Sequence, residues 1–154
     1  MNRIWKPNVT VAALIERDGR FLLVEEETPE GVRFNQPAGH LDEGESLMEA
    51  CARETLEETA WRFRPTALVG IYMWPRPKRE NEGDITYLRF AFAGTLGEEQ
   101  AGRSLDTGIL RAVWLTPQEI EASRERHRSP LVWQGVQDYL AGRRYPMEIL
   151  RHYV

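Results

Sequence analysis

One segment, GHLDEGESLMEACARETLEETAW from Gly39 to Trp61, constrains this chain more than any other. Its last third holds three glutamates, Glu54, Glu57 and Glu58, at offsets of three and four residues. In an α-helix that spacing puts the three side chains within about 100° of arc on one face. Because carboxylates this close repel one another unless a cation lies between them, the pattern predicts a metal site on the side of a helix.

The other side of this helix is predicted to pack on a hydrophobic core. Its side chains are apolar or small, namely Leu47, Met48, Cys51, Ala52, Thr55 and Leu56. Ser46 with Glu49 three residues later predicts a capping box at the helix start. Arg53 stands four residues before Glu57 and can pair with it. Ala50, the small residue within the acidic arc, is expected to leave room there for an ion or a phosphate.

The same residues resemble the Nudix family signature, whose fixed positions are separated by fixed gaps. The matching positions are Gly39, Glu45, Arg53, Glu54, Glu57 and Glu58. Thr55 and Trp61 stand where the family has aliphatic residues, and Ala60 stands where it has glycine. A left-handed residue at a helix end costs a non-glycine roughly 1 kcal/mol. We therefore expect Ala60 to make the helix end less favourable and to leave the chemistry unaffected.

The resemblance implies an α/β/α Nudix sandwich with a mixed β-sheet, and hydrolysis of a phosphoanhydride with Mg²⁺, for which Mn²⁺ can substitute. It implies that the metal is held by a main-chain carbonyl and three carboxylates, from Gly39, Glu54, Glu57 and Glu58. Arg53 is expected among the catalytic residues. The general base is expected to be Glu57 or Glu54, and the residue types alone do not separate the ligand and base roles.

Matches outside the signature extend the resemblance to bacterial phosphatases of the family. They are KPNVTV from Lys6, NQPAGHL from Asn35, LRF from Leu88, RSPLV from Arg128 and RYP from Arg144. The resemblance implies release of inorganic phosphate from hydroxymethylpyrimidine pyrophosphate, thiamine pyrophosphate or nucleoside di- and triphosphates. Two alternatives remain open. One is a housecleaning nucleoside triphosphate pyrophosphohydrolase, and the other is a non-catalytic module that senses a ligand.

Several further residues have both a functional and a structural interpretation. Glu45 either fixes Arg53 and the loop or is a surface carboxylate that favours the helix dipole. His40 either contacts a phosphate or makes a structural hydrogen bond. The loop with Trp74, Arg76, Lys78 and Arg79 suits a diphosphate on a flat heterocycle, or merely keeps an exposed connection soluble. Stacking or amide hydrogen bonds to a pyrimidine are predicted for the side chains of Trp5, Asn35 and Gln36.

The rest of the chain alternates strand-like and helix-like segments. Strands are predicted at residues 9–15, 21–27, 33–37, 68–74, 86–96 and 109–115, and further helices at 117–123 and 130–140. Asp18-Gly19 between the first two strands predicts a hairpin turn. A mixed sheet between helices is the simplest three-layer arrangement of these elements.

Composition limits the remaining possibilities. The 154 residues suit a single domain, expected over residues 1–154. A net charge of −4 argues against a general nucleic-acid binder. We find no signal peptide and no run of 18 apolar residues, so we expect a cytoplasmic protein without membrane contact. The expected partner is a small-molecule diphosphate, bound by a monomer or a small homo-oligomer.

Overall fold

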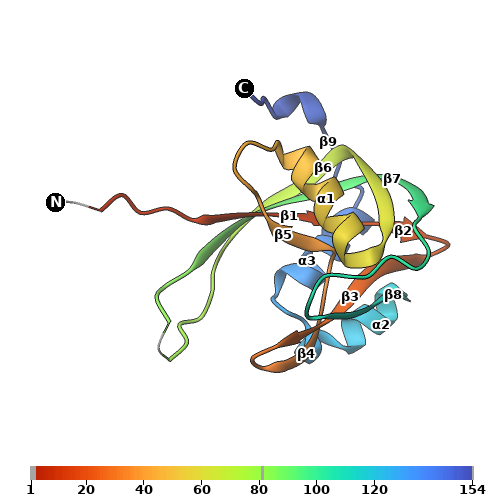
Figure 1. Ribbon diagram of the computed structural model, residues 1–154, viewed down its shortest axis with the longest axis horizontal. Coiled ribbons are helices and arrows are strands. Elements are labelled where there is room, and N and C mark those ends of the chain that lie inside the picture. Colours follow the sequence, from red (N-terminus) through yellow and green to blue (C-terminus); the bar gives the residue numbers. More distant parts are fainter. Residues whose placement is uncertain (1–2, 81, 154) are drawn as a thin grey trace.

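The computed structural model describes residues 3–80 and 82–153. Figure 1 shows strands and helices interleaved along the chain, with the loop between β6 and β7 projecting from the rest. The elements are β1 (Asn8–Ala13), β2 (Glu16–Arg17), β3 (Arg20–Thr28), β4 (Gly31–Asn35), β5 (Ala38–His40), α1 (Leu47–Thr59), β6 (Trp61–Pro75), β7 (Thr86–Glu99), β8 (Ile109–Leu115), α2 (Pro117–Ala122), α3 (Leu131–Leu140) and β9 (Tyr145–Pro146). Short 3₁₀ helices lie at Arg124–Arg126 and Met147–Ile149.

The strands form two sheets. One is a five-stranded sheet with the order β5-β1-β7-β6-β9. It is mixed, because β1 and β7 are parallel and its other neighbours are antiparallel. In the second sheet β3 pairs with β2, β4 and β8, all antiparallel. The predicted mixed sheet is therefore confirmed, and a second, antiparallel sheet accompanies it.

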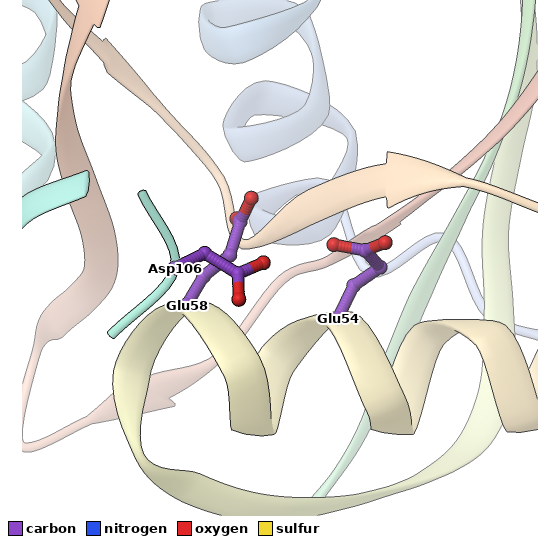
Figure 2. Close-up of side chains that lie close together, drawn as sticks. All are labelled: Glu54, Glu58 and Asp106. Carbon is purple, nitrogen blue, oxygen red and sulfur yellow. The ribbon is translucent and has the colours of Figure 1, made fainter. Parts of the chain in front are cut away.

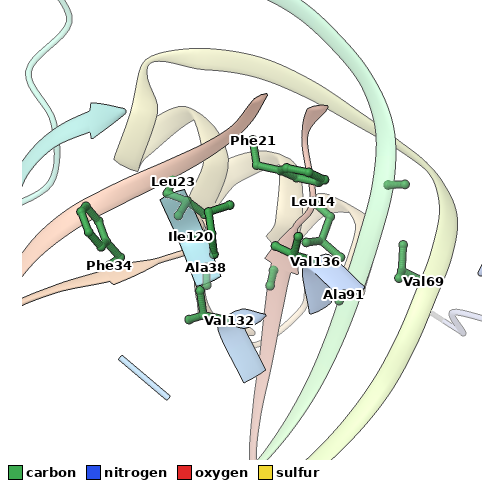
Figure 3. Close-up of a cluster of buried hydrophobic side chains, with 12 residues drawn as sticks. Leu14, Phe21, Leu23, Phe34, Ala38, Val69, Ala91, Ile120, Val132 and Val136 are labelled. Atoms are coloured by element: carbon green, nitrogen blue, oxygen red, sulfur yellow. The ribbon is translucent and has the colours of Figure 1, made fainter. Parts of the chain in front are cut away.

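Side chains on β1 alternate between two hydrophobic cores. Val11 and Ala13 pack with residues of α1, whereas Ala12 belongs to a core with residues of α2 and α3. The second of these cores is drawn in Figure 3, where Val136 of α3 lies beside Leu14. Because successive strand residues point to opposite faces, the sheet is covered by helices on both sides. This arrangement confirms the predicted α/β/α fold class.

The hairpin turn at Asp18-Gly19 is confirmed, but it joins different strands from those predicted. Both residues have left-handed φ angles, 53° and 77°, as a two-residue hairpin turn of the mirror-image type requires. The strand that pairs with β3 across this turn is the short β2. β1 instead pairs with β5 and β7 in the other sheet. The chain thus changes sheets between Ala13 and Glu16.

Helix α1 has the predicted start and end. The Ser46 hydroxyl accepts a hydrogen bond from the Glu49 amide at 3.1 Å, and the Glu49 carboxylate accepts one from the Ser46 amide at 3.1 Å. At the other end Ala60 has a left-handed φ of 66°, and its amide donates to the Leu56 carbonyl. One expectation needs correction, because Ala50 is fully buried in the core and leaves no space for an ion. No helix within residues 3–80 and 82–153 is long and apolar enough to cross a membrane.

Replacing Ala60 by Gly is expected to stabilise the fold by about 0.5–1 kcal/mol. The substitution removes the steric cost of a left-handed L-residue, which exceeds the entropy that glycine adds to the unfolded chain. For a chain of this size the melting temperature should rise by about 1–4 °C, measured by calorimetry. Ala52→Gly, within the same helix, serves as the control and should lower it. A lower melting temperature for Ala60→Gly would contradict the argument.

Candidate active site

Two glutamates of α1 and one aspartate from the loop between β7 and β8 converge at one place. One carboxylate oxygen from each of Glu54, Glu58 and Asp106 lies within 4.8 Å of the other two. Figure 2 shows the three side chains on the same side of α1. The Asp106 amide donates to the Glu57 carbonyl at 3.0 Å, which fixes this loop against the end of the helix. Three carboxylate oxygens this close suit a hard cation that prefers oxygen ligands, such as Mg²⁺.

The structure brings Glu54 and Glu58 together as predicted, but it places Glu57 apart from this group. The Glu57 side chain is 31% exposed, and one of its oxygens lies 3.3 Å from a guanidinium nitrogen of Arg53. Glu54 and Glu58 are separated by one helical turn and share a face with Asp106 beside it, whereas Glu57 is not part of the group. The group of three carboxylates thus includes one residue, Asp106, that the helix spacing does not indicate.

Arg53 connects the helix to the preceding loop. Its Nε and Nη2 atoms donate to the two oxygens of Glu45 at 3.0 and 2.7 Å, and its Nη1 donates to Glu54 at 2.8 Å. Nη2 also donates to the His40 carbonyl at 3.0 Å. Glu45 in turn accepts from the Asp42 amide at 2.8 Å. This geometry favours the interpretation that Glu45 fixes Arg53 and the loop, since a paired Arg–carboxylate fork resists rotation.

Gly39 lies directly under the carboxylate of Glu54. A Cβ atom built on Gly39 would lie 2.2 Å from the Glu54 Cδ and 2.3 Å from one of its oxygens. Strand β5 carries Gly39 beside β1, opposite Val11. Glycine at this position therefore allows the Glu54 carboxylate to rest on the backbone of β5, next to the main-chain carbonyl that the sequence predicts as a ligand.

Burial changes the acidity of the two converging glutamates. Glu58 is 9% exposed, and one of its oxygens accepts a hydrogen bond from the Ala38 amide at 3.0 Å. Burial raises the pKa of Glu58 to about 9. The hydrogen bond from the Ala38 amide lowers this pKa, but by less than burial raises it. Burial also raises the pKa of Glu54, while Arg53 opposes this change. A bound cation would favour the charged form of both carboxylates. Without a cation, burial makes that charged form unfavourable, so the site suits a metal ion.

A cavity of about 330 Å³ opens beside these carboxylates. Its lining includes three carboxylates, Glu26, Glu54 and Glu58, and four guanidinium groups, Arg76, Arg79, Arg89 and Arg128. Trp74 and Tyr87 also line it and stack at 6.0 Å with an interplanar angle of 17°. The cavity can hold a cation at Glu54 and Glu58 and phosphate groups at the arginines, next to a flat aromatic surface.

Arg89 is a buried cation in this cavity. It is 8% exposed and donates to the side-chain oxygens of Asn35 and Gln36, each at 3.1 Å. Burial lowers its pKa to about 10, so Arg89 remains charged near neutral pH. Neither of these two acceptors is a carboxylate, and the guanidinium keeps donors for a bound phosphate.

The predicted substrate contacts separate into two groups. Asn35, His40, Trp74, Arg76 and Arg79 line the cavity. The other three, Gln36, Lys78 and Trp5, do not. Gln36 is corrected to a supporting residue, because it is 1% exposed and both ends of its amide are used, by Arg89 and by the Val132 carbonyl at 2.8 Å. Trp5 is 62% exposed and lies outside the lining.

Sequence reasoning missed several side chains of the site, among them Glu26, Asp106, Tyr87, Arg89 and Arg128. A signal existed for Arg89, since it interrupts the apolar run of β7. Arg128 stands in a segment that resembled the family's phosphatases. Asp106 lies in a polar loop without hydrophobic periodicity, and no neighbouring motif indicated that it belongs to the site.

Comparisons with known proteins agree with this geometry. The NUDIX domain family model matches residues 5–134. The chain is 37% identical to Phosphatase NudJ of Escherichia coli strain K12 over 147 residues, 96% of this chain and 92% of that protein. It is 52% identical to a NUDIX hydrolase of known structure from Nitrosomonas europaea, with a TM-score of 0.89 and coverage of 96% and 98%. A MutT NUDIX hydrolase from Burkholderia pseudomallei, 19% identical with a TM-score of 0.70, shows likeness of fold alone.

Proposed function

The chain belongs to the NUDIX family, and from that premise we propose that it is a Mg²⁺-dependent phosphatase of small organic diphosphates and nucleotides. Membership among the Nudix hydrolases of phosphoanhydrides rests on the family match and on two relatives above 30% identity. The convergence of Glu54, Glu58 and Asp106 within 4.8 Å is the observation that carries the metal requirement.

Each residue of the site is assigned one role in this proposal. Glu54 and Glu58 with the Gly39 carbonyl would hold Mg²⁺, and Asp106 is close enough to join them, whereas Glu57 lies outside this group and is left for proton transfer. The ion supplies charge neutralisation of the diphosphate and a more acidic water. Arg89, with Arg76 and Arg128, binds the phosphate oxygens and positions the phosphorus. Electrostatic positioning of this kind supplies most of the acceleration in phosphoryl transfer.

Proton transfer is assigned to a glutamate of α1. Glu57 is the favoured general base, because its carboxylate is more exposed than that of Glu54 and has a longer contact with Arg53. Glu54 is the alternative. It is held by Arg53 at 2.8 Å and rests on Gly39, so it has less freedom to accept a proton from water. Arg53 and Glu45 act as positioning residues that keep both carboxylates in place.

The substrate class follows from the basic wall and the aromatic pair. Trp74 and Tyr87 offer a stacking surface for a planar ring, with His40 beside Tyr87 at a ring distance of 6.4 Å. Hydroxymethylpyrimidine pyrophosphate, thiamine pyrophosphate and nucleoside di- and triphosphates share a planar ring and a diphosphate. We propose attack of water on the terminal phosphorus, with cleavage of its anhydride bond, so that a diphosphate gives inorganic phosphate and the organic monophosphate and a triphosphate gives inorganic phosphate and the diphosphate.

A substrate panel with product identification tests this function. With Mg²⁺ we expect inorganic phosphate from ring-bearing diphosphates, loss of at least 10³-fold of activity after chelation, and recovery with Mg²⁺ or Mn²⁺. Full activity after exhaustive metal removal would refute the metal requirement. Release of pyrophosphate from nucleoside triphosphates, with diphosphates inert, would replace the proposal by a housecleaning pyrophosphohydrolase. Ligand binding without turnover would indicate a sensing module.

A further inference from the structure

A second cavity adjoins the one that holds the carboxylates. It has a volume of about 590 Å³ and shares Trp74, Arg76, Arg79, Arg128 and Ser129 with the first. Its own lining adds residues of the loop after β6 and of the segment before α3, namely Lys78, Arg124, His127, Pro130 and Trp133 among others. None of the candidate metal ligands lines it. A group bound there lies beyond the phosphate that is hydrolysed.

The wall of this second cavity is strongly basic. Its described lining contains five arginine and lysine side chains and a single carboxylate, that of Glu30. Arg79 pairs with Glu30, and Arg128 pairs with Glu26 at 3.1 Å. Lys78 and Arg124 make no ion pair within the part of the chain that the structure describes. Positive charge is therefore left over in a concave site, where it raises the local concentration of anions.

Arg76 lies where the two cavities meet and has an unused donor. Its side chain is 10% exposed, and its guanidinium pairs with Glu82 through Nη2. The Nε atom of Arg76 is buried and has no hydrogen-bond partner among the described residues. A buried donor without an acceptor is costly, and a group that accepts from it removes that cost. Arg76 therefore keeps an unused donor on a residue that lines both cavities, which favours a ligand oxygen near this side chain.

The aromatic residues favour a planar ring between the diphosphate in the first cavity and an anionic group in the second. Trp74 lines both cavities and stacks on Tyr87 in the first. Trp133 closes the second cavity on the side of α3. A planar ring on Trp74 would place its phosphoanhydride toward the carboxylates and its opposite end toward Lys78 and Arg124. The order along the site would then be metal, diphosphate, ring and a second basic site.

We propose that this second cavity binds an additional anionic group of the substrate, remote from the phosphoanhydride that is cleaved. The inference rests on the proposed hydrolase function and narrows its substrate class. The favoured substrates carry a planar ring, a diphosphate and a further phosphate or carboxylate. A diphosphate whose organic half is cationic gains nothing from the second cavity, because like charges meet there, so thiamine pyrophosphate should have the highest KM of the proposed substrates.

A matched pair of substrates tests the proposal by kinetics. One is a nucleoside 5′-diphosphate, and the other is the same compound with a phosphate on its ribose. We expect the extra phosphate to lower KM by about tenfold with little change in kcat, since the contact is made equally in the ground and transition states. Lys78→Gln/Arg124→Gln should bring the ratio of the two KM values toward one. The exposed Arg62, which lines neither cavity, provides the control Arg62→Gln, which should leave the ratio unchanged.

A binding measurement gives a readout that does not depend on turnover. Inorganic phosphate is titrated into the metal-free protein in the presence of a chelator, with tryptophan fluorescence as the signal, because Trp74 and Trp133 line the cavity. We expect saturable binding that weakens with salt and is at least fivefold weaker in Lys78→Gln/Arg124→Gln and in Arg76→Gln.

The outcomes separate this inference from the function on which it rests. Equal KM values for the two substrates, with variants that change neither the ratio nor phosphate binding, would overturn the second site and leave the hydrolase intact. If neither substrate were hydrolysed, the proposed hydrolase function would fail. The phosphate titration alone would then decide whether the second cavity binds an anion. Binding lost in the double variant would support the basic site, and binding absent or unchanged would refute it.

Discussion

Replacing Glu58 by Gln is expected to lower kcat by about 10²-fold or more while the metal-free protein loses no stability. Gln keeps the volume of the side chain and an oxygen that can accept the hydrogen bond from the Ala38 amide, which is 3.0 Å from the carboxylate. It removes the negative charge that a bound cation needs. The rise in melting temperature that Mg²⁺ gives the wild-type protein should shrink in the variant.

The pH dependence of stability gives the same substitution a second signature. Burial raises the pKa of Glu58 from an ordinary 4.5 to about 9. In the unfolded chain Glu58 loses its proton near its ordinary pKa, while in the metal-free folded state it keeps the proton up to the raised one. The unfolded state therefore binds fewer protons between these values, and the free energy of unfolding falls as the pH rises through that window. Denaturation of the metal-free proteins at pH 5 and pH 8 should show a smaller fall for Glu58→Gln.

Glu43→Gln is the matched control for Glu58→Gln. Glu43 is exposed, stands in the loop before α1, and makes no hydrogen bond or ion pair through its side chain among the described residues. It undergoes the same chemical change, and we expect kcat and the Mg²⁺ effect to stay near wild type. Turnover of Glu58→Gln close to wild type would mean that the metal does not depend on this carboxylate.

Replacing Gly39 by Ala is expected to lower kcat by a similar factor, of about 10² or more, through Glu54. The new Cβ would lie 2.2 Å from the Glu54 Cδ, so the carboxylate must move off β5. Such a displacement removes a charge from the metal site and disturbs the contact of Glu54 with Arg53 at 2.8 Å. The fold should persist, because the clashing atoms are the far end of a flexible side chain. Kinetics and a melting curve with and without Mg²⁺ measure both effects.

Gly83→Ala provides the corresponding control. Gly83 lies in the loop between β6 and β7, and a Cβ built there meets no atom within 4 Å. Since neither glycine has a left-handed φ, both substitutions are permitted by the backbone, and only the one at Gly39 meets a functional side chain. If Gly39→Ala kept wild-type activity and Mg²⁺ affinity, catalysis would not require the Glu54 carboxylate to rest on the backbone at Gly39.

Local features of the chain were predictable, as α1 illustrates. The capping box of Ser46 and Glu49, the left-handed Ala60 and the shared face of Glu54 and Glu58 all follow from relations within a few residues. Helical periodicity and end geometry depend on the backbone of one or two turns, so they can be inferred without knowing what the helix packs against. The strand at Ile109–Leu115 was likewise placed by its own composition.

Contacts between distant segments of the chain could not be predicted from local sequence patterns. Asp106 joins Glu54 across 52 positions of the sequence, and the amide of Gln36 turns inward because it bonds Arg89 of β7 and Val132 of α3. The prediction that residues 9–15 pair with β3 across the Asp18-Gly19 turn was wrong, because β1 pairs with β7 in the other sheet.

The amino-acid pattern was sufficient to predict the helix, its three glutamates, the loop glycine beside them and the class of chemistry that such a pattern serves. Which carboxylates converge, which predicted contacts are buried and where the two cavities meet depend on the packing of distant segments. The difference lies in the range of the interactions. Helix spacing and caps are set by neighbours along the chain, whereas the site is completed by strand pairing and loop closure, whose free energy depends on the packing of the whole core.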